Sequence, residues 1–279
     1  MEKSFDLSII ILTWNSKEFI ERCIRSIYNG ISSISFEVVI VDNGSIDSTK
    51  KILENYMNQY KNFRVIFLGK NFGTTKSRNI GIKEAKGEYI LFLDSDAEVK
   101  KDTISKLLET FNQEKNVGAV APKILGSNGE IQYSCKKFPT LPIKVLKFLG
   151  SLKIFRSLKN RVEQLELYNE KVYEEGVYEV DYCITACLLT KREMLNKIGL
   201  FDENIFYAPE DVDLCLRLWI NGFKVLYNGN AEAIHHSQRL SYRSFKVLFS
   251  HFCGLVYYFK KHGYLFSRRS LYKRIDKNK

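Results

Sequence analysis

The sequence predicts an α/β protein with a mainly parallel, Rossmann-like central sheet flanked by helices. Two observations predict this fold class. Short apolar runs alternate with amphipathic stretches through the first half of the chain, which is typical of βαβ units. Polar residues, several of them Asp or Asn, follow these runs where parallel strands would end. With 279 residues and 45% hydrophobic content, the chain is long enough for one large domain or two modest ones.

The first half of the chain is expected to hold five strands with helices between them. Each strand is a short apolar run, and the helices are marked by apolar residues at three- and four-residue spacing. The expected strands are residues 7–12, 36–41, 63–68, 89–93 and 117–121, and the helices lie around residues 19–27, 52–60, 74–85 and 104–111.

Beyond Pro122 the regular alternation stops. The Asn128-Gly129 pair between two apolar stretches is a hairpin signal. Residues 136–176 form a less regular segment that is helical only in places. The other expected elements are a strand pattern over 177–190, a helix over 210–221 that ends at Gly222, strands over 223–227 and 231–235, and a final amphipathic helix over 245–261.

Three of the expected strands end in polar residues at what would be one edge of the sheet. No glycine-rich phosphate loop follows the first strand, so a bound diphosphate would need another source of positive charge. Mg²⁺ is typically held by one or two carboxylates together with substrate phosphates, and two Asp residues two apart on an extended chain point the same way. The strand-end residues are Thr13 and Asn15, Asp42 and Asn43, and Asp94 and Asp96.

An acidic helix start and a histidine pair lie later in the chain. Asp213 is explained by the positive end of the helix dipole and by an i, i+4 pair with Arg217. Glu210 and Asp211 are adjacent, and the Asp213–Arg217 pair cannot explain why both are present. The sequence AEAIHHSQ places two histidines at the end of a strand, where a histidine facing two aspartates would complete a metal site.

Most of the net charge of +11 belongs to the C-terminal tail. From residue 240 onward the chain carries ten Lys or Arg against one Asp, interleaved with ten aromatic residues. Three interpretations remain open: a helix that packs on the main domain, a basic amphipathic helix at an anionic membrane surface, and a nucleic-acid contact through stacking and phosphates, which we consider unlikely.

Cellular location is predicted from apolar runs and cysteines. The apolar runs are much shorter than the roughly 20 residues that span a bilayer, and the N-terminus has no cleavage site typical of a signal peptide. The six cysteines form no CxxC pair, which favours reduced core thiols. We expect a cytoplasmic protein, with the tail as a means of contact with the inner face of the cell membrane.

Four segments together resemble the family-2 glycosyltransferases of the GT-A fold, in particular the subgroup with rhamnosyltransferases. They are LSIIILTWN, FEVVIVDNGSIDST, NFGTTKSRNIGIKEAKGEYILFLDSDAEV and GLFDENIFYAPEDVDLCLRLWINGFKV followed by the histidines. They cover roughly residues 5–240 in the order and spacing of the family. The DxD motif is weak by itself, and the combination is specific.

The resemblance implies a role for each matching residue. Asp211 would be the catalytic base, and Glu210 beside it would orient the acceptor. Asp94, Asp96 and His235 would hold a Mg²⁺ or Mn²⁺ ion, with His236 as a less favoured substitute for His235. The residues that would contact the donor nucleotide are Thr13, Asn15, Asp42, Asn43, Arg78, Asp94 and Ser95.

The implied activity is inverting, metal-dependent sugar transfer. The donor would be a nucleotide-diphosphate sugar, dTDP-rhamnose or a UDP-hexose. The acceptor would be a hydroxyl of a glycan or lipid-linked molecule in cell-surface polysaccharide or glycoconjugate assembly. Residues 1–240 would form the GT-A domain, with a nucleotide-sugar-binding half over 1–122 and an acceptor-side half with a smaller sheet over 123–240. Residues 241–279 would form a helical extension.

The chain departs from the family pattern at two places. The chain has Ile184-Thr185-Ala186-Cys187 where relatives often have a glycine-containing turn, and Ala208-Pro209 where an aromatic residue is common. Both lie near the expected acceptor pocket.

Two other functions compete with sugar transfer. One is that of a haloacid-dehalogenase-type phosphatase with a strand-end DxD, which leaves VDNGS and EDVDL unexplained. The other is a non-catalytic module that binds nucleic acid or a membrane surface through the tail.

Overall fold

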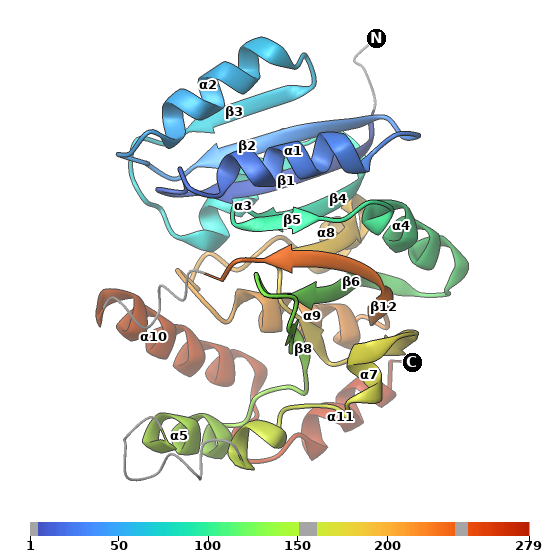
Figure 1. The fold of residues 1–279 in the computed structure, drawn as a ribbon. Helices are drawn as coiled ribbons and strands as arrows, with labels where there is room; N and C mark the ends of the chain where they lie inside the picture. The colour runs from blue at the N-terminus through green and yellow to red at the C-terminus, as the bar shows by residue number, and fades with distance from the viewer. Residues whose placement is uncertain (1–4, 151–160, 238–244, 279) are drawn as a thin grey trace.

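A computed structural model describes residues 5–150, 161–237 and 245–278. Its central sheet has the strand order β3-β2-β1-β4-β11-β6-β12-β5, with β7 and β9 attached to β6 and β12 (Figure 1). The first half of the chain builds the β3–β4 side of this sheet. Its elements are β1 (Phe5–Thr13), α1 (Ile20–Gly30), β2 (Phe36–Asp42), α2 (Thr49–Gln59), β3 (Phe63–Phe67), α3 (Thr74–Glu84) and β4 (Gly87–Asp94).

The first four strands, β1 to β4, are parallel to one another, as the alternating pattern predicts. In the register, Thr13 lies opposite Asp42, and Leu12 lies opposite Asp94. The polar residues that follow these strands therefore meet at one edge of the sheet, which is where open parallel sheets bind ligands.

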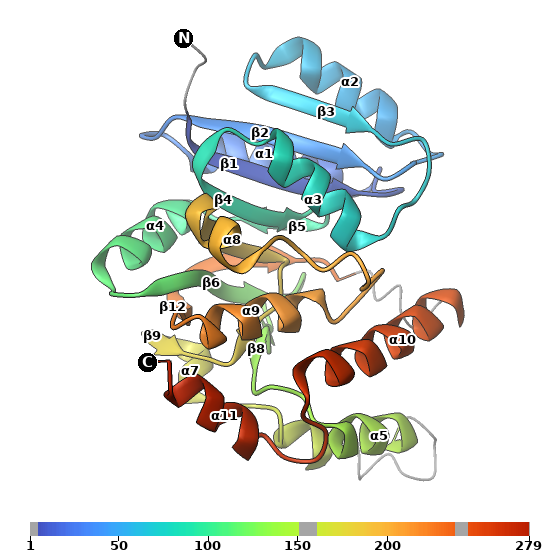
Figure 2. The same ribbon diagram turned by 180° about the vertical axis from the view of Figure 1, so that it is seen from behind.

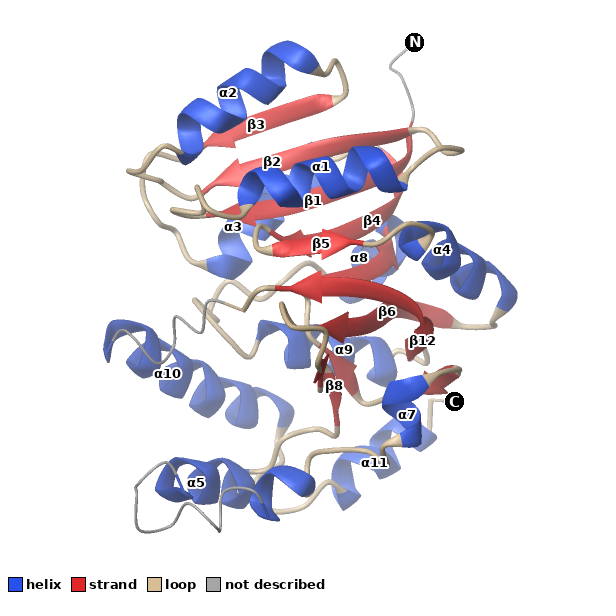
Figure 3. Cartoon of the chain, in the orientation of Figure 1, coloured by secondary structure: helices blue, strands red, loops and turns tan. Residues whose placement is uncertain are grey.

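The chain from residue 97 onward adds antiparallel strands and the lower helices in Figure 3. β11 lies antiparallel between β4 and β6, so the sheet is mixed although most of its long pairings are parallel. The elements are β5 (Ala97–Val99), α4 (Thr103–Gln113), β6 (Val117–Leu125), β7 (Ile131–Gln132), β8 (Cys135–Lys136), α5 (Leu141–Gly150), α7 (Lys171–Glu174), β9 (Val177–Glu179), β10 (Tyr182–Cys183), β11 (Cys187–Lys191), α8 (Arg192–Ile198), α9 (Glu210–Ile220), β12 (Lys224–His235), α10 (Phe245–His262) and α11 (Arg269–Asp276).

Three details differ from the expected elements. β6 continues through Pro122 to Leu125, and the two expected strands 223–227 and 231–235 are one strand, β12, with a bulge between Asn228 and Glu232. Asp94 and Asp96 do not share an extended strand, because β4 ends at Asp94 and a turn leads into β5. The hairpin at Asn128-Gly129 forms between β6 and β7, and β8 and β10 make the expected smaller sheet.

Helices cover both faces of the sheet, and strand alternation divides the core accordingly. Ile9 and Ile11 of β1 pack in the cluster that includes α1, whereas Ile10 packs in the cluster that includes α3. This period of two is the pattern of a strand that is buried on both faces. α1 and α4 lie on the face seen in Figure 1, and α3, α8 and α9 lie on the face seen in Figure 2.

The C-terminal helices pack on the rest of the chain. Tyr258 and Phe259 of α10 and Leu271 and Ile275 of α11 are buried in the same cluster as α9. Packing of the tail on the rest of the chain is thus confirmed at these buried residues of α10 and α11. The expected domain boundary at residue 240 lies outside the described residues and stays a prediction. Within the described ranges, no helix is both long enough and apolar enough to cross a membrane.

Candidate active site

Asp94, Asp96 and His235 converge at the carboxyl edge of the sheet. One ligand atom from each residue lies within 4.8 Å of the other two. His235 Nε2 is 3.4 Å from Asp96 Oδ1 and 3.9 Å from Asp94 Oδ2. The pairing of β5 with the end of β12 produces this geometry, because it places His235 opposite Ala97, directly after the turn that holds Asp96.

The three side chains fit a divalent cation. Two carboxylates and an imidazole nitrogen can hold Mg²⁺ or Mn²⁺. His235 Nδ1 lies 3.3 Å from Gln132 Oε1, so a proton on Nδ1 would leave Nε2 free as a ligand. Burial lowers the pKa of His235, but the neighbouring Asp96 and Asp94 carboxylates outweigh burial and raise it. The site therefore favours positive charge.

His236 has other partners in the structure, and this distinguishes it from His235. Its Nε2 is 2.6 Å from Glu98 Oε1, its Nδ1 is 2.9 Å from Ser127 Oγ, and its ring stacks on Phe19. Both ring nitrogens thus have partners away from the Asp94–Asp96 pair. The geometry favours His235 over His236 as the third metal ligand.

Arg78 connects the metal-binding residues to the acidic start of α9. The guanidinium donates to Asp94 Oδ1 at 2.8 Å, to Glu210 Oε1 at 3.1 Å and to Thr185 Oγ1 at 2.6 Å. Its side chain is only 6% exposed. Arg78 was expected near the donor nucleotide or its phosphates, and here it lies buried between two carboxylates of the site.

Glu210 and Asp211 are adjacent, but their environments differ. Glu210 is paired with Arg78, whereas Asp211 has no cationic partner within hydrogen-bonding distance among the described residues. Its Oδ1 accepts only the backbone N–H of Val212, at 2.7 Å. Burial, together with the charge of Glu210, raises the pKa of Asp211 to about 7. Two carboxylates with different environments at one helix start are typical of an acid–base site.

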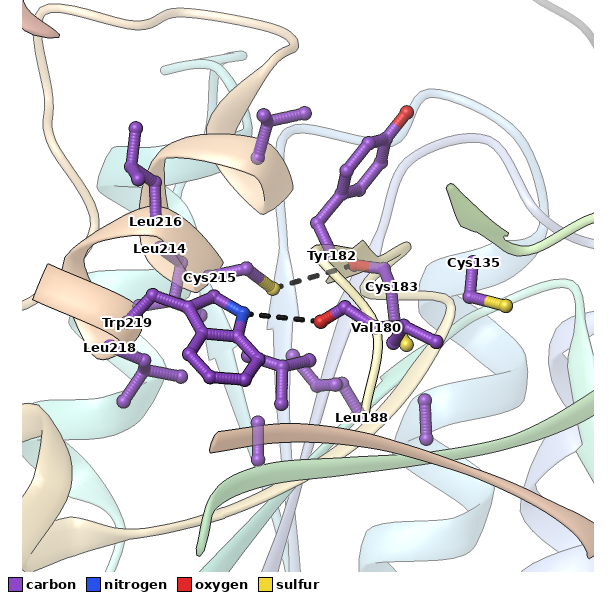
Figure 4. Close-up of a cluster of buried hydrophobic side chains, with 14 of the residues drawn as sticks. Cys135, Val180, Tyr182, Cys183, Leu188, Leu214, Cys215, Leu216, Leu218 and Trp219 are labelled. Atoms are coloured by element: carbon purple, nitrogen blue, oxygen red, sulfur yellow. Dashed lines mark hydrogen bonds between the residues drawn. The ribbon is translucent and has the colours of Figure 1, made fainter. Parts of the chain in front are cut away.

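The body of α9 fixes the position of these two carboxylates. Trp219 Nε1 donates to Val180 O at 3.1 Å, and Cys215 Sγ contacts Cys183 O at 3.8 Å (Figure 4). At the start of the helix, Asp213 is fully buried and pairs with Arg217, as expected from the i, i+4 spacing. Asp213 also binds Lys261 and His262 of α10, so the C-terminal helix helps to hold α9.

The predicted nucleotide contacts lie at the ends of β1 and β2, beside the metal-binding residues. Thr13 and Asp42 are fully buried; Thr13 Oγ1 has no hydrogen-bond partner among the described residues, and Asp42 accepts the backbone N–H of Ser45. Asn15 Oδ1 accepts a hydrogen bond from the backbone N–H of Ile46. Ser95 Oγ lies 2.8 Å from Ser16 Oγ.

Asn43 ties down a loop. Its side-chain oxygen accepts the Phe72 backbone N–H and the Ser77 hydroxyl, and its amide nitrogen donates to Asn71 and Gly73. These bonds occupy the amide group within the protein. The nucleotide-binding role of Asn43 stays a prediction, and it would require a contact through the Asn43 backbone.

Comparison with known proteins identifies the family. A family model described as "Glycosyl transferase family 2" matches residues 8–199. The chain belongs to glycosyl transferase family 2. Among curated members, it is 32% identical over 254 residues to the Staphylococcus aureus poly(ribitol-phosphate) beta-N-acetylglucosaminyltransferase TarS, covering 84% of this chain and 43% of TarS. It is 26% identical over 241 residues to the Mycobacterium tuberculosis N-acetylglucosaminyl-diphospho-decaprenol L-rhamnosyltransferase, covering 82% of this chain and 76% of that protein. The chain therefore spans less than half of TarS.

Solved structures confirm the GT-A fold expected for a family-2 member. TarS 1-349 of S. aureus in complex with UDP-GlcNAc superposes with a TM-score of 0.54 at 24% identity, covering 84% of this chain and 61% of that chain. GalNAc-T7 with UDP, GalNAc and Mn²⁺ superposes with a TM-score of 0.63 at 18% identity, covering 83% of this chain and 43% of that chain. At these identities the likeness shows the fold alone.

Sequence reasoning missed two residues of this family-2 site. Thr185 supports Arg78, and Gln132 orients His235. Thr185 lies in the segment that departs from the family pattern, and the departure was attributed to the acceptor pocket. No spacing rule could have paired Thr185 with Arg78, because the two are 107 residues apart.

Proposed function

We propose that this protein is an inverting, metal-dependent glycosyltransferase. It moves a sugar from a dTDP-rhamnose or UDP-hexose donor to a hydroxyl of a glycan or lipid-linked acceptor, in cell-surface polysaccharide or glycoconjugate assembly. The observation that carries the proposal is the contrast between two adjacent carboxylates. Glu210 is ion-paired with Arg78, which also binds Asp94. Asp211 has no such partner among the described residues, and its pKa is raised to about 7. The names of the two curated relatives support this substrate class.

In the proposed reaction, Asp211 accepts the proton of the acceptor hydroxyl. The acceptor oxygen attacks the anomeric carbon as the bond from that carbon to the diphosphate oxygen breaks, and the electron pair leaves with the nucleoside diphosphate. A pKa near the operating pH suits a general base. Glu210 pairs with Arg78 and orients the acceptor. Asp94, Asp96 and His235 would hold Mg²⁺ or Mn²⁺, which when bound supplies Lewis-acid stabilisation to the leaving diphosphate.

A phosphatase of the haloacid-dehalogenase type fits the site less well. Such an enzyme needs a strand-end aspartate free to act as a nucleophile. Asp94 at the end of β4 is instead hydrogen-bonded to the buried Arg78 guanidinium. Membership of glycosyl transferase family 2 favours sugar transfer as well.

A panel of nucleotide sugars tests the proposal. With Mn²⁺ present, we expect release of the nucleoside diphosphate from one donor of the panel, and loss of that release when EDTA is added. Asp96→Ala should abolish the metal dependence together with donor turnover. Release that is equal with and without EDTA, or phosphate release from simple monoesters in its place, would contradict the assignment.

We further propose that α10 contacts an anionic membrane surface. An apolar stripe at three- and four-residue spacing faces solvent on this helix, with Phe249 at 60%, Phe252 at 62% and Val256 at 51% exposure. Exposed Cys253 lies within the stripe and exposed Lys260 continues it. Aromatic residues beside basic ones suit the interface of an anionic bilayer. The net charge of +11 complements such a surface.

Vesicle sedimentation tests this contact with a point variant. A chain that ends before α10 is unsuitable, because it would lose the buried Tyr258 and Leu271. Phe249→Ser combined with Phe252→Ser should abolish binding to phosphatidylglycerol vesicles, whereas Met57→Ser, at an exposed apolar residue of α2, should keep it. Equal binding of both proteins, or equal binding to phosphatidylcholine vesicles, would argue against the membrane contact.

A further inference from the structure

Two lysines pair with a single buried carboxylate in the half of the fold expected to face the acceptor, and a third lysine lies within electrostatic range of them. Lys144 Nζ of α5 lies 3.1 Å from Glu166 Oε1, and Lys147 Nζ lies 2.9 Å from Glu166 Oε2. Glu166 is fully buried, and the two lysine side chains are about one-quarter exposed. Lys136, at the end of β8, is the third lysine. We call Lys136, Lys144 and Lys147 the lysine cluster.

Lys136 has no counterion of its own. Its side chain is half-buried, and its ammonium makes no hydrogen bond or ion pair with any residue of the described ranges. Burial and the charges of Lys147 and Lys144 lower its pKa, although the charges of Glu166 and Asp211 oppose this shift. The neighbouring backbone N–H of Lys137 donates to Glu166 O at 2.8 Å, which fixes this strand end beside Glu166. Glu166 is therefore paired with two of the three ammonium groups, and the half-buried charge of Lys136 is costly without an ion pair.

The side chain of Lys136 faces the region of the catalytic base. Lys136 lies directly opposite Tyr182 in the β8–β10 pair, and opposed residues of an antiparallel pair project from the same face. Burial raises the pKa of Tyr182, and the charges of both Glu166 and Asp211 add to this effect. Tyr182 thus lies within electrostatic range of both carboxylates, on the face that Lys136 shares.

α10 packs on the loop before Asp211 and lies within electrostatic range of Lys144. A Cβ atom on Gly254 would lie only 2.2 Å from Ala208 O, so α10 packs closely on the segment that leads into Glu210. Burial and the charge of Lys144 lower the pKa of His251, three residues earlier on α10, to about 4. Figures 1 and 2 both show α5 and α10 close together, on the side of α9 away from α1 and α2.

We propose that the lysine cluster binds a phosphate group of the acceptor substrate. This inference rests on the proposed function, since it assigns the acceptor of the same site. The ligand class is an acceptor whose sugar or polyol is joined to a phosphate, as a phosphodiester or as a diphosphate. An anionic phosphate balances the excess positive charge and accepts charge-assisted hydrogen bonds from ammonium groups, which a neutral glycan would not do.

The geometry assigns different tasks to the three lysines. Glu166 holds Lys144 and Lys147 in place, so these two ammonium groups are positioned before the ligand arrives. Lys136 is free of such a tie and keeps its donors for the ligand. The cluster also offsets the repulsion that a phosphate would feel from the carboxylates of Glu210 and Asp211.

Equilibrium binding of three acceptor mimics tests the inference. The probes are an N-acetylhexosamine joined to an undecyl chain through a diphosphate, an oligomer of polyol phosphodiesters, and an undecyl N-acetylhexosaminide without phosphate. UDP and Mn²⁺ are present so that the donor side is filled. We expect at least one phosphorylated probe to bind about tenfold more tightly than the phosphate-free probe. Preference for the diphosphate would identify a lipid-linked acceptor, and preference for the phosphodiester would identify a polymer.

Lys136→Met should remove the advantage of the phosphorylated probe, a loss of about tenfold. Lys136→Arg keeps the charge and should keep most of the affinity. Lys137→Met is the matched control, because the Lys137 ammonium lies over the Tyr168 ring, 5.6 Å from its centroid. Unchanged binding in Lys136→Met, or equal binding of all three probes to the wild type, would overturn the proposal. Thermal melting of each variant would reveal any misfolding.

Binding of UDP with Mn²⁺, measured alone, separates this inference from the proposed function. If neither UDP nor dTDP binds, the donor assignment fails, while the acceptor mimics still report on the lysine cluster. If the nucleotide binds normally and the phosphorylated probes show no dependence on Lys136, only the lysine inference fails.

Discussion

The Arg78 guanidinium donates a hydrogen bond to Glu210, a residue 132 positions later in the chain, and another to Asp94 at the end of β4. This contact joins the two halves of the site. The Asp94 side holds the predicted metal and donor, and the Glu210 side begins the helix that carries the predicted base. Arg78 thus fixes the position of the predicted metal site relative to the predicted base. Its pairing with Glu210 leaves Asp211 without a cationic partner among the described residues.

Replacement of Arg78 should destabilise the fold as well as the site. Arg78→Met leaves two carboxylates without their buried partner, and we expect a loss of about 3 kcal/mol in the free energy of unfolding. Urea unfolding would measure it. Arg25→Met is the matched control, because the Arg25–Glu21 pair is exposed to solvent and its loss should leave stability nearly unchanged. Similar losses in both variants would contradict a structural role for the Arg78 contacts.

The two histidines should differ in metal binding. His235→Ala removes a predicted ligand and should weaken Mn²⁺ binding by at least about tenfold, whereas His236→Ala should leave it nearly unchanged. Gln132→Ala should have a smaller effect, through the orientation of His235. Titration of Mn²⁺ by electron paramagnetic resonance would measure the affinities. A larger loss in His236→Ala would reverse the assignment.

The raised pKa of Asp211 should make stability depend on pH at this residue. A carboxyl whose folded pKa is about 7 and whose unfolded pKa is near 4 favours the folded state while it is protonated, and this contribution is lost as pH rises through about 7. Asp211→Asn should therefore melt at a higher temperature than the wild type at pH 8, with the difference shrinking toward pH 4. An equal difference at both pH values would show that Asp211 titrates normally.

Much of the site could be predicted from local sequence. Apolar runs that end in Thr13, Asp42 and Asp94 predict parallel strands with polar ends, because strand burial and turn formation are local properties. The family resemblance then selected His235 and Asp211 from farther along the chain. These expectations needed only the order of the elements and the common edge of a parallel sheet.

The remaining contacts depend on tertiary packing that no local pattern records. The buried bonds of Arg78 come from three distant segments, and the turn between Asp94 and Asp96 forms because β5 leaves to pair with β12. The lysine cluster lies in the irregular segment 136–176, where spacing carries no periodic signal. The cluster can be recognised only in the folded structure, where Glu166 and Asp211 lie within electrostatic range of it.

Single-turnover sugar transfer by Asp211→Asn tests the central claim most directly. Donor and Mn²⁺ binding should match the wild type, because Asp211 lies outside the predicted metal and nucleotide contacts. The rate of transfer should fall by roughly 10²- to 10⁴-fold, the usual contribution of a general base. In the wild type, the same rate should rise with pH and reach half its maximum near 7, since only the ionised Asp211 accepts the proton. Transfer by Asp211→Asn at the wild-type rate would show that another group is the base.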